Sequence, residues 1–175
     1  MRATIATALT VAVLTLPGAT GCSSDPRQGY SFEPSFRNDV TTVSVPVWQN
    51  NTFYNGLEAK LAQALVTELS RSTPYKVTSS GNAGTVLEGT ITSVELRDLS
   101  TGRETGLVQE LSLEVVCDFA WKDTRSGKAL AARRNFSAAR SFVPANGARE
   151  RIEIGENAAV QQLARDIVAE MRSGW

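Results

Sequence analysis

An alternation of apolar and polar side chains between residues 111 and 121 constrains the fold more than any other stretch of this sequence. Apolar residues occupy every second position: Leu111, Leu113, Val115, Cys117, Phe119 and Trp121. Most of the residues between them are polar, so the pattern predicts a strand of about 11 residues, about 37 Å long, with one buried face. Such a strand needs an apolar layer packed over that face.

The segments that follow this strand predict an antiparallel hairpin. Residues 123–128 are polar, and Gly127 is suited to a positive φ in the turn. The weaker alternation of residues 130–142 then predicts a strand that runs back beside the first.

An extended stretch from Val86 predicts a third long strand with an irregularity. Leu87 and Ile91 fall on one face, whereas Val94 and Leu96 have the opposite parity. A bulge near Thr92-Ser93 would restore the register, because one extra residue reverses the side to which later side chains point.

Residues 40–48 predict a shorter, half-buried strand. The expected buried face carries Val43, Val45 and Val47. Pro46 lacks a backbone N–H, so we expect it at a sheet edge or where the ladder of hydrogen bonds is interrupted.

A helix is predicted from Gly56 to about Arg71. Asn55 stands three residues before Glu58, which suggests that the two side chains cap the first free amides. Thr73-Pro74 should end the helix, and residues 75–78 are a candidate for a short strand.

A final helix carries an apolar stripe made of Ala159, Val160, Leu163, Ala164, Ile167, Val168 and Met171. An alternative start for this helix lies upstream of Gly155, where residues 149–154 are compatible with an earlier turn. The resulting order is β-α-β-β-β-α. We therefore expect an α+β, two-layer sandwich in which one four-stranded mixed sheet packs against two helices.

The N-terminus resembles a bacterial lipoprotein signal peptide. Arg2 precedes an apolar stretch from Ala3 to Leu16, and small residues lead into Cys22. The stretch is too short to span a hydrocarbon core of about 30 Å as a helix. An ordinary cleaved secretory signal is the alternative.

This resemblance implies that residues 1–21 are removed and that Cys22 becomes a lipidated N-terminus. Several acyl chains, at about 0.8 kcal/mol per buried methylene, would hold it at a membrane. Ser23 after the cysteine implies sorting to the outer membrane, with the protein facing the periplasm. Residues 22–39 would be a lipidated tether, and residues 40–175 a single domain.

Composition argues against several classes of function. The 18 basic residues equal the 18 acidic ones in number, so bulk charge favours no nucleic-acid partner. Histidine is absent, and with it the usual proton shuttle and the commonest metal ligand. We expect no enzymatic activity, catalytic residue, metal or cofactor. Acylation of Cys22 would leave Cys117 without a disulfide partner, as a small buried apolar residue.

Five local sequences, in this order and spacing, resemble those of the lipopolysaccharide-assembly outer-membrane lipoprotein family, LptE. They are residues 29–32 (GYSF), 43–53 (VSVPVWQNNTF), 56–58 (GLE), 86–91 (VLEGTI) and 165–168 (RDIV). The resemblance covers essentially the whole mature chain. The family usually places Gly-Tyr directly after the lipid cysteine, whereas residues 23–28 intervene here.

The resemblance implies a non-enzymatic partner of the β-barrel translocon that inserts lipopolysaccharide into the outer membrane. Members of the family sit inside the barrel as a plug, assist its assembly and contact lipopolysaccharide. A second resemblance, in an early strand that ends in an Asn-rich turn and leads to a helix, is to outer-membrane lipoproteins that activate peptidoglycan synthases. That function is the alternative.

Basic residues near the predicted hairpin are candidates for binding the phosphates of lipopolysaccharide: Lys122, Arg125, Lys128, Arg133 and Arg134. Arg can bind a phosphate through two parallel hydrogen bonds, and Lys supplies a point charge. Basic residues also commonly guard a sheet edge against pairing with other chains, which is the alternative role for this group.

Overall fold

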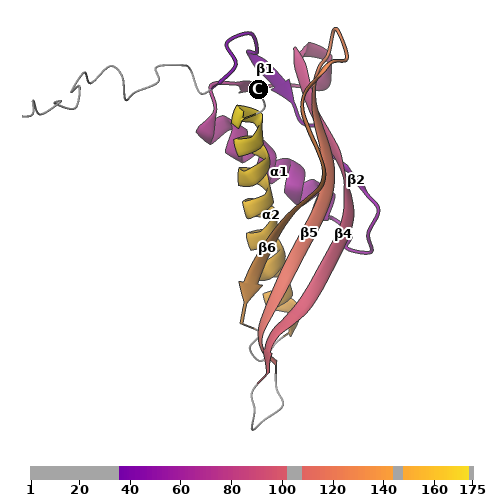
Figure 1. Cartoon of the computed structure of the whole chain (residues 1–175), viewed down its shortest axis with the longest axis vertical. Coiled ribbons are helices and arrows are strands. Elements are labelled where there is room, and N and C mark those ends of the chain that lie inside the picture. The colour runs from indigo at the N-terminus through magenta and orange to yellow at the C-terminus, as the bar shows by residue number, and fades with distance from the viewer. Residues whose placement is uncertain (1–35, 102–107, 144–147, 174–175) are drawn as a thin grey trace, which may run out of the picture. The chain divides into compact units, whose positions relative to one another are not determined.

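The computed structural model describes residues 36–101, 108–143 and 148–173 (Figure 1). Residues 1–35, including Cys22, lie outside the described part of the chain. The elements follow one another as β1 (Thr42–Ser44), β2 (Gln49–Asn50), α1 (Leu57–Ser72), β3 (Lys76–Val77), a 3₁₀ turn (Ser80–Asn82), β4 (Thr85–Thr101), β5 (Val108–Asp123), β6 (Ala129–Phe142) and α2 (Ala148–Ser173).

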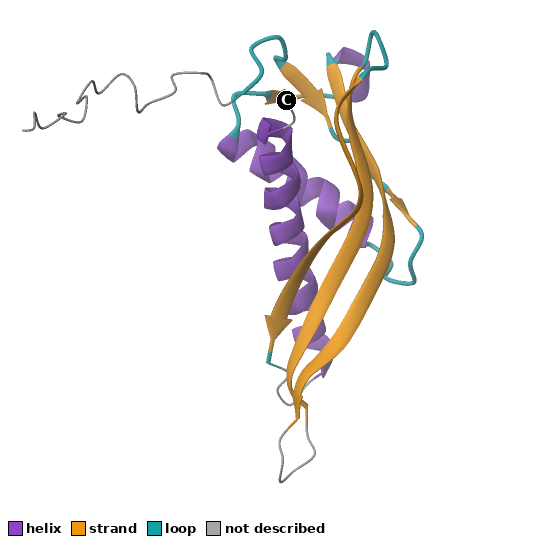
Figure 2. Cartoon of the chain, in the orientation of Figure 1, coloured by secondary structure: helices purple, strands orange, loops and turns teal. Residues whose placement is uncertain are grey.

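The strands form one six-stranded mixed sheet in the order β3-β1-β4-β5-β6, and β2 also pairs with β4. β1 and β2 run parallel to β4, whereas β4, β5 and β6 are antiparallel neighbours. Both helices lie against one face of the long strands (Figure 2). The predicted two-layer α+β sandwich is confirmed. The predicted count of four strands is too low, because the first strand is split in two and β3 adds a short edge.

The long central strand, β5, has the predicted parity. The side chains of Leu113, Val115 and Cys117 are completely buried beneath the helices. The predicted bulge in β4 is also confirmed, since Ile91 is opposite Cys117 and Ser93 is opposite Val116, which leaves one extra residue between them.

The predicted burial of Val47 is wrong, because the ladder between the first strand and β4 is interrupted. Ser44 is opposite Val86, but Gln49 is opposite Thr90, so the β1–β2 segment contains one residue more than β4 between these pairs. The interruption includes Pro46, as expected of a residue without a backbone N–H. It reverses the parity, so that Trp48 is buried and Val47 is 64% exposed.

The N-terminus of α1 differs in detail from the predicted cap. Gly56 is the N-cap residue, with a φ of 85°, and no side chain caps the helix there. The predicted cap by Asn55 is therefore wrong. Glu58 does reach back, because its Oε1 accepts a hydrogen bond of 3.3 Å from the Gly56 N–H. The helix ends as predicted, with the Thr73 N–H donating to the Leu69 carbonyl.

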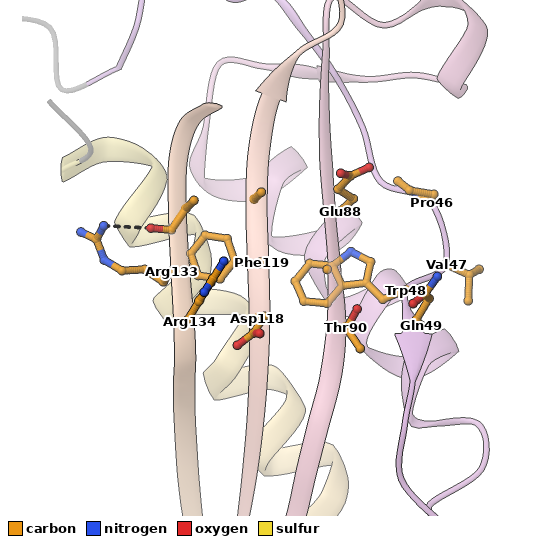
Figure 3. A pocket seen from close by; sticks show the side chains of 13 residues that line it. Pro46, Val47, Trp48, Gln49, Glu88, Thr90, Asp118, Phe119, Arg133 and Arg134 are labelled. Atoms are coloured by element: carbon orange, nitrogen blue, oxygen red, sulfur yellow. Dashed lines mark hydrogen bonds between the residues drawn. The ribbon is translucent and has the colours of Figure 1, made fainter. Parts of the chain in front are cut away.

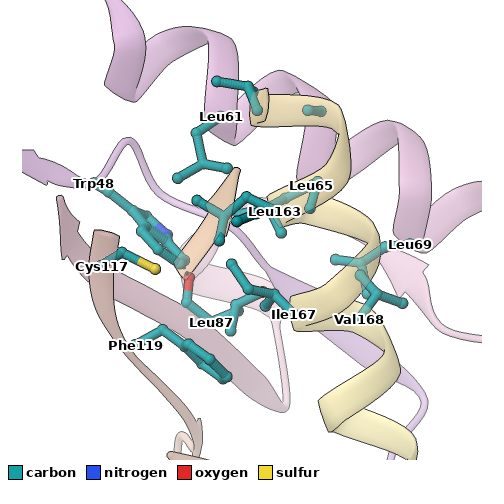
Figure 4. Close-up of a cluster of buried hydrophobic side chains, with 14 of the residues drawn as sticks. Trp48, Leu61, Leu65, Leu69, Leu87, Cys117, Phe119, Leu163, Ile167 and Val168 are labelled. Carbon is teal, nitrogen blue, oxygen red and sulfur yellow. Dashed lines mark hydrogen bonds between the residues drawn. The ribbon is translucent and has the colours of Figure 1, made fainter. Parts of the chain in front are cut away.

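The core lies between the two helices and the inner face of the sheet (Figure 4). The predicted stripe of α2 is buried along its whole length. It meets Leu61, Leu65 and Leu69 of α1 above Leu87, Cys117 and Phe119 of the sheet. Burial raises the pKa of the Cys117 thiol to about 12, so this cysteine packs as a neutral apolar group.

The segment that leads into β1 is fastened to the domain by aromatic contacts. The Phe36 ring meets the Tyr75 ring edge to face at 5.9 Å, and Tyr75 in turn lies 5.6 Å from the ring of Trp121. The guanidinium of Arg172, near the end of α2, lies 4.8 Å from the centre of the Phe36 ring. Such contacts each contribute modestly beyond the area that they bury.

Gly89 in β4 allows a close approach that positions Trp48. A Cβ atom added at Gly89 would lie 2.7 Å from the Trp48 ring and 2.5 Å from the Asp118 carbonyl oxygen. Trp48 is held there by its indole N–H, which donates to the Leu87 carbonyl at 3.3 Å. Only a residue without a side chain fits between the indole and the neighbouring strand.

We predict that Gly89→Ala destabilises the domain by about 1–3 kcal/mol, since neither the indole nor the backbone of β5 can yield without loss of packing. Gly81→Ala is the matched control, because a Cβ at Gly81 would meet no atom within 4 Å. Denaturant titration of both variants provides the measurement. Equal midpoints for the two would contradict the close-packing argument.

A second prediction tests the parity of β5. Phe119→Ala should lower the free energy of unfolding by about 3–5 kcal/mol, because it leaves a cavity in the core. Glu114→Ala should change it by no more than about 0.5 kcal/mol, since Glu114 lies on the opposite face in an exposed ion pair with Arg97. Similar losses in urea titrations of the two variants would refute the assignment of faces.

Candidate functional site

The β5–β6 hairpin is a preorganised turn that presents two basic side chains. Asp123 Oδ1 accepts hydrogen bonds from the backbone N–H of Ser126 at 2.7 Å, from the Ser126 hydroxyl at 2.8 Å and from the Arg125 N–H at 3.1 Å. These bonds, first those from Ser126, lower the pKa of the Asp123 carboxyl group. Gly127 has the predicted positive φ, 68°. Arg125 and Lys128 are exposed, and within the described chain no acidic side chain pairs with either.

Two other predicted phosphate-binding residues are engaged in ion pairs. Lys122 Nζ lies 2.5 Å from a carboxylate oxygen of Glu88 on β4. Arg133 is directed to the other layer, where its guanidinium lies 2.7 Å from a carboxylate oxygen of Glu170 on α2. Their charges are therefore already balanced by carboxylates of the same domain.

The fifth predicted residue, Arg134, sits at a bulge in β6. Cys117 is opposite Phe136 and Phe119 is opposite Arg133, so two residues of β6 face a single residue of β5, Asp118. Asn135 has a φ of 51°, and its N–H donates to Asp118 Oδ1 at 2.8 Å. The structure thus does not gather the five basic residues into one site. It separates them into a hairpin pair, two ion-paired residues and a bulge residue.

Arg134 lines a trough on the face of the sheet that the helices leave open (Figure 3). The trough has a volume of about 710 Å³. Small residues make its floor, and the break between β1 and β2 forms one wall. The lining includes Pro46, Val47, Gln49, Thr90, Ala120 and Ala132.

The charged side chains of the trough are largely engaged within the domain. Its two carboxylates are engaged, Glu88 with Lys122 and Asp118 with the Asn135 N–H. Trp48 and Phe119 close the trough from the core side and are themselves buried. What remains accessible is a mixed polar and apolar surface that includes Val47, with the guanidinium of Arg134 at one side.

A second surface, at the far end of the long strands, escaped the sequence analysis. It exposes large apolar side chains that we call the apolar end: Leu96, Leu99, Val143 and Ile154, which are 40%, 55%, 62% and 57% exposed. Pairing of Leu96 with Leu113 and of Leu111 with Phe142 places the strand residues at one end of the sheet. Gly155 abuts the Phe142 ring, which brings the start of α2 to the same end.

A signal for this surface was present in the sequence. Ile154 is a large apolar residue that lies off the buried stripe of α2, and Leu99 stands three residues after Leu96, an odd spacing that gives it the opposite parity in a regular strand. Side chains that are apolar but have no packing partner in a predicted layer mark an interaction surface.

Two other features of function are absent from the described ranges. No cluster of three or more potential metal ligands occurs among residues 36–101, 108–143 and 148–173. In the same part of the chain, neither helix is both long enough and apolar enough to cross a membrane.

Several solved structures are similar to this one at low sequence identity, and the two with TM-scores above 0.5 share its fold. A hypothetical protein from Chlamydia trachomatis is 12% identical, with a TM-score of 0.55 over 77% of this chain and 96% of that one. A protein from Xanthomonas campestris is 9% identical, with a TM-score of 0.57 over 77% and 85%. Rare lipoprotein B from Shewanella oneidensis is 22% identical, with a TM-score of 0.49 over 76% and 95%. No curated protein sequence matches the chain significantly.

The sequence itself matches one family model. The match is to the lipopolysaccharide-assembly family and extends over residues 40–171. This range contains all six strands and almost all of both helices. Because the match covers more than half of the sequence, the chain belongs to the lipopolysaccharide-assembly family, LptE.

Proposed function

We propose that this member of the lipopolysaccharide-assembly family acts at the outer membrane as a non-enzymatic partner and plug of the β-barrel translocon that inserts lipopolysaccharide. Cys22 carries the lipid anchor in this proposal, and the domain faces the periplasm. The family match supports the role in lipopolysaccharide assembly. The apolar end of the sheet is the structural observation that best supports contact with a lipid substrate.

The apolar end fits the acyl portion of lipopolysaccharide. Leu96 has the inward parity of its partner Leu113, yet it is 40% exposed, and Leu99 is 55% exposed. Each square ångström of apolar surface removed from water contributes about 25 cal/mol. A few acyl methylenes on these side chains would therefore give weak, reversible binding, as suits a protein that handles a lipid in transit.

The hairpin offers a separate contact for phosphate groups. Arg125 and Lys128 project from a turn that Asp123 holds in place, so binding an anion would cost little ordering of the backbone. The hairpin begins 10 residues after Leu113, the buried pairing partner of Leu96, a distance of about 33 Å along β5. Phosphate and acyl contacts at these two surfaces should therefore be separable by mutation.

We predict that two double variants weaken lipopolysaccharide binding in different ways. Charge reversal, Arg125→Glu with Lys128→Glu, should reduce affinity several-fold at 0.1 M salt. The difference should fade at 1 M salt as the Debye length falls from about 10 Å to about 3 Å. Leu96→Ser with Leu99→Ser should reduce affinity at both salt concentrations, because apolar contacts are not screened. Titration of labelled lipopolysaccharide against the soluble domain gives both affinities.

Melting temperatures serve as the control for this pair, because substitution of exposed residues should leave them nearly unchanged. If charge reversal leaves binding intact at low salt, the hairpin is not a phosphate site. If the wild-type domain is stable but binds no lipopolysaccharide, and the full chain copurifies with a peptidoglycan synthase instead of a barrel, the alternative function replaces this proposal.

The lipid anchor has its own test. Cys22→Ala should abolish incorporation of a clickable palmitate in growing cells, since the thioether linkage needs the sulfur of that cysteine. Cys117→Ala is the matched control, because the Cys117 side chain is buried in the core. Equal labelling of the Cys22→Ala variant and the wild type would exclude lipidation at this position.

A further inference from the structure

The loop between β2 and α1 is a rigid structure that projects beside the edge of β4 (Figure 2). Asn50 organises it through both ends of its side-chain amide. The amide nitrogen donates to the Tyr54 carbonyl and to Glu58 Oε2, each at 2.7 Å. The amide oxygen accepts from the Thr52 N–H at 2.9 Å and from the Thr52 hydroxyl at 2.7 Å.

Further bonds join this loop to the rest of the domain. The Asn51 N–H donates to the Ile91 carbonyl of β4 at 3.0 Å, and the Tyr54 N–H donates to the Thr52 hydroxyl at 3.2 Å. Hydrogen bonds to the Glu58 carboxylate, first from its own backbone N–H and then from Asn50, lower its pKa. Glu58 is thus a charged acceptor at neutral pH, and it holds the loop against the start of α1.

This ordered loop holds Phe53 fully in solvent. The side chain is 101% exposed, whereas the adjacent Tyr54 packs against the core. None of the hydrogen bonds that order the loop involves the Phe53 side chain. Because the ring is fully exposed, it buries no surface in the domain, and the packing of the fold does not account for its presence.

Phe53 is one of five exposed residues that alternate along the sequence with less exposed ones, which we call the β4-edge row: Val47, Gln49, Asn51, Phe53 and Asn55. The row combines two apolar side chains with three amides. Residues 40–57 contain no Asp, Glu, Lys or Arg, although charged residues make up 21% of the chain. Val47 and Gln49 also line the trough on the open face, so the two surfaces are continuous.

The chemistry of this row favours a protein partner over a membrane. Peripheral binding to anionic lipid relies on basic side chains around the apolar ones, and this segment has none. Cores of protein interfaces are instead poor in charge and rich in aromatic anchors, which are surrounded by polar groups. A preordered loop also lowers the entropy lost on binding.

We propose that the β4-edge row docks against the inner wall of the β-barrel partner, with Phe53 seated in an apolar pocket of that wall. This inference rests on the proposed function. The lumen of an outer-membrane barrel is polar, so it can exchange hydrogen bonds with Gln49, Asn51 and Asn55 without requiring opposite charges. Phe53 then supplies the central anchor of the contact.

Site-specific photocrosslinking of the full-length lipoprotein, co-expressed with the barrel translocon protein of the same organism, tests this surface. Phe53 is replaced by p-benzoyl-L-phenylalanine, and the control places the same group at Asn82, which is exposed on the 3₁₀ turn. We expect an adduct with the barrel protein from position 53 and none from position 82.

Copurification gives a quantitative readout of the same contact. Phe53→Ser should lower the amount of barrel retained after detergent washing by about fivefold or more, the loss expected for an aromatic anchor. Its melting temperature should remain that of the wild type. Phe53→Leu should retain most of the barrel, because an apolar side chain still fills the pocket, and Asn82→Ser should behave as the wild type.

The outcomes separate this inference from the proposed function. If the wild type retains the barrel but Phe53→Ser retains as much and position 53 gives no adduct, the row is not the docking surface and the proposed function stands. An adduct between two copies of this chain would also overturn the inference. If the wild type retains no barrel at all, the proposed function and this inference both fail.

Discussion

The turn of Trp48 into the core over Gly89 determines which side chains of the β1–β2 segment face outward. The ladder between the first strand and β4 breaks around Pro46, and one extra residue reverses the parity of the chain. The Trp48 indole N–H donates to the Leu87 carbonyl and so satisfies a backbone acceptor that no strand pairs at the break. Val47 therefore faces outward and forms part of the trough wall. After this break β2 pairs with β4 again, which places Asn50 at the start of the loop.

The open face of the sheet is nearly self-compensating in charge. Glu88 pairs with Lys122, and Arg97 pairs with both Glu95 and Glu114. Exposed ion pairs of this kind contribute little to the free energy of unfolding. They do cancel most of the electrostatic field that this face would otherwise present to a partner. Binding must therefore depend on a few groups that the domain does not neutralise, together with exposed apolar side chains.

The sequence predicted those features that depend on periodicity within one element. The parity of β5, the bulge near Thr92-Ser93 and the stripe of α2 follow from the spacing of apolar side chains alone. The burial of Val47 and the cap by Asn55 were predicted wrongly, because tertiary contacts decide both. Trp48 needs Gly89 from a distant strand, and Asn50 in β2 organises the start of the helix.

The basic residues were predicted as one group because they are close in sequence. Alternation along β6 instead sends Arg133 to α2, and the bulge at Asn135 sets Arg134 apart from it.

The separation of the exposed surfaces itself argues for a binding role. Catalysis requires several groups to converge on one reacting atom, whereas here the free basic residues, the apolar end and the β4-edge row occupy different parts of the domain. In the proposed function, a lipid contact at one end of the sheet would leave the row beside β4 available to a protein partner at the same time. The long strands set the spacing between these surfaces, and hydrogen bonds span their bulges, from the Asn135 N–H to Asp118 Oδ1 in one and from the Thr92 hydroxyl to the Val116 carbonyl in the other.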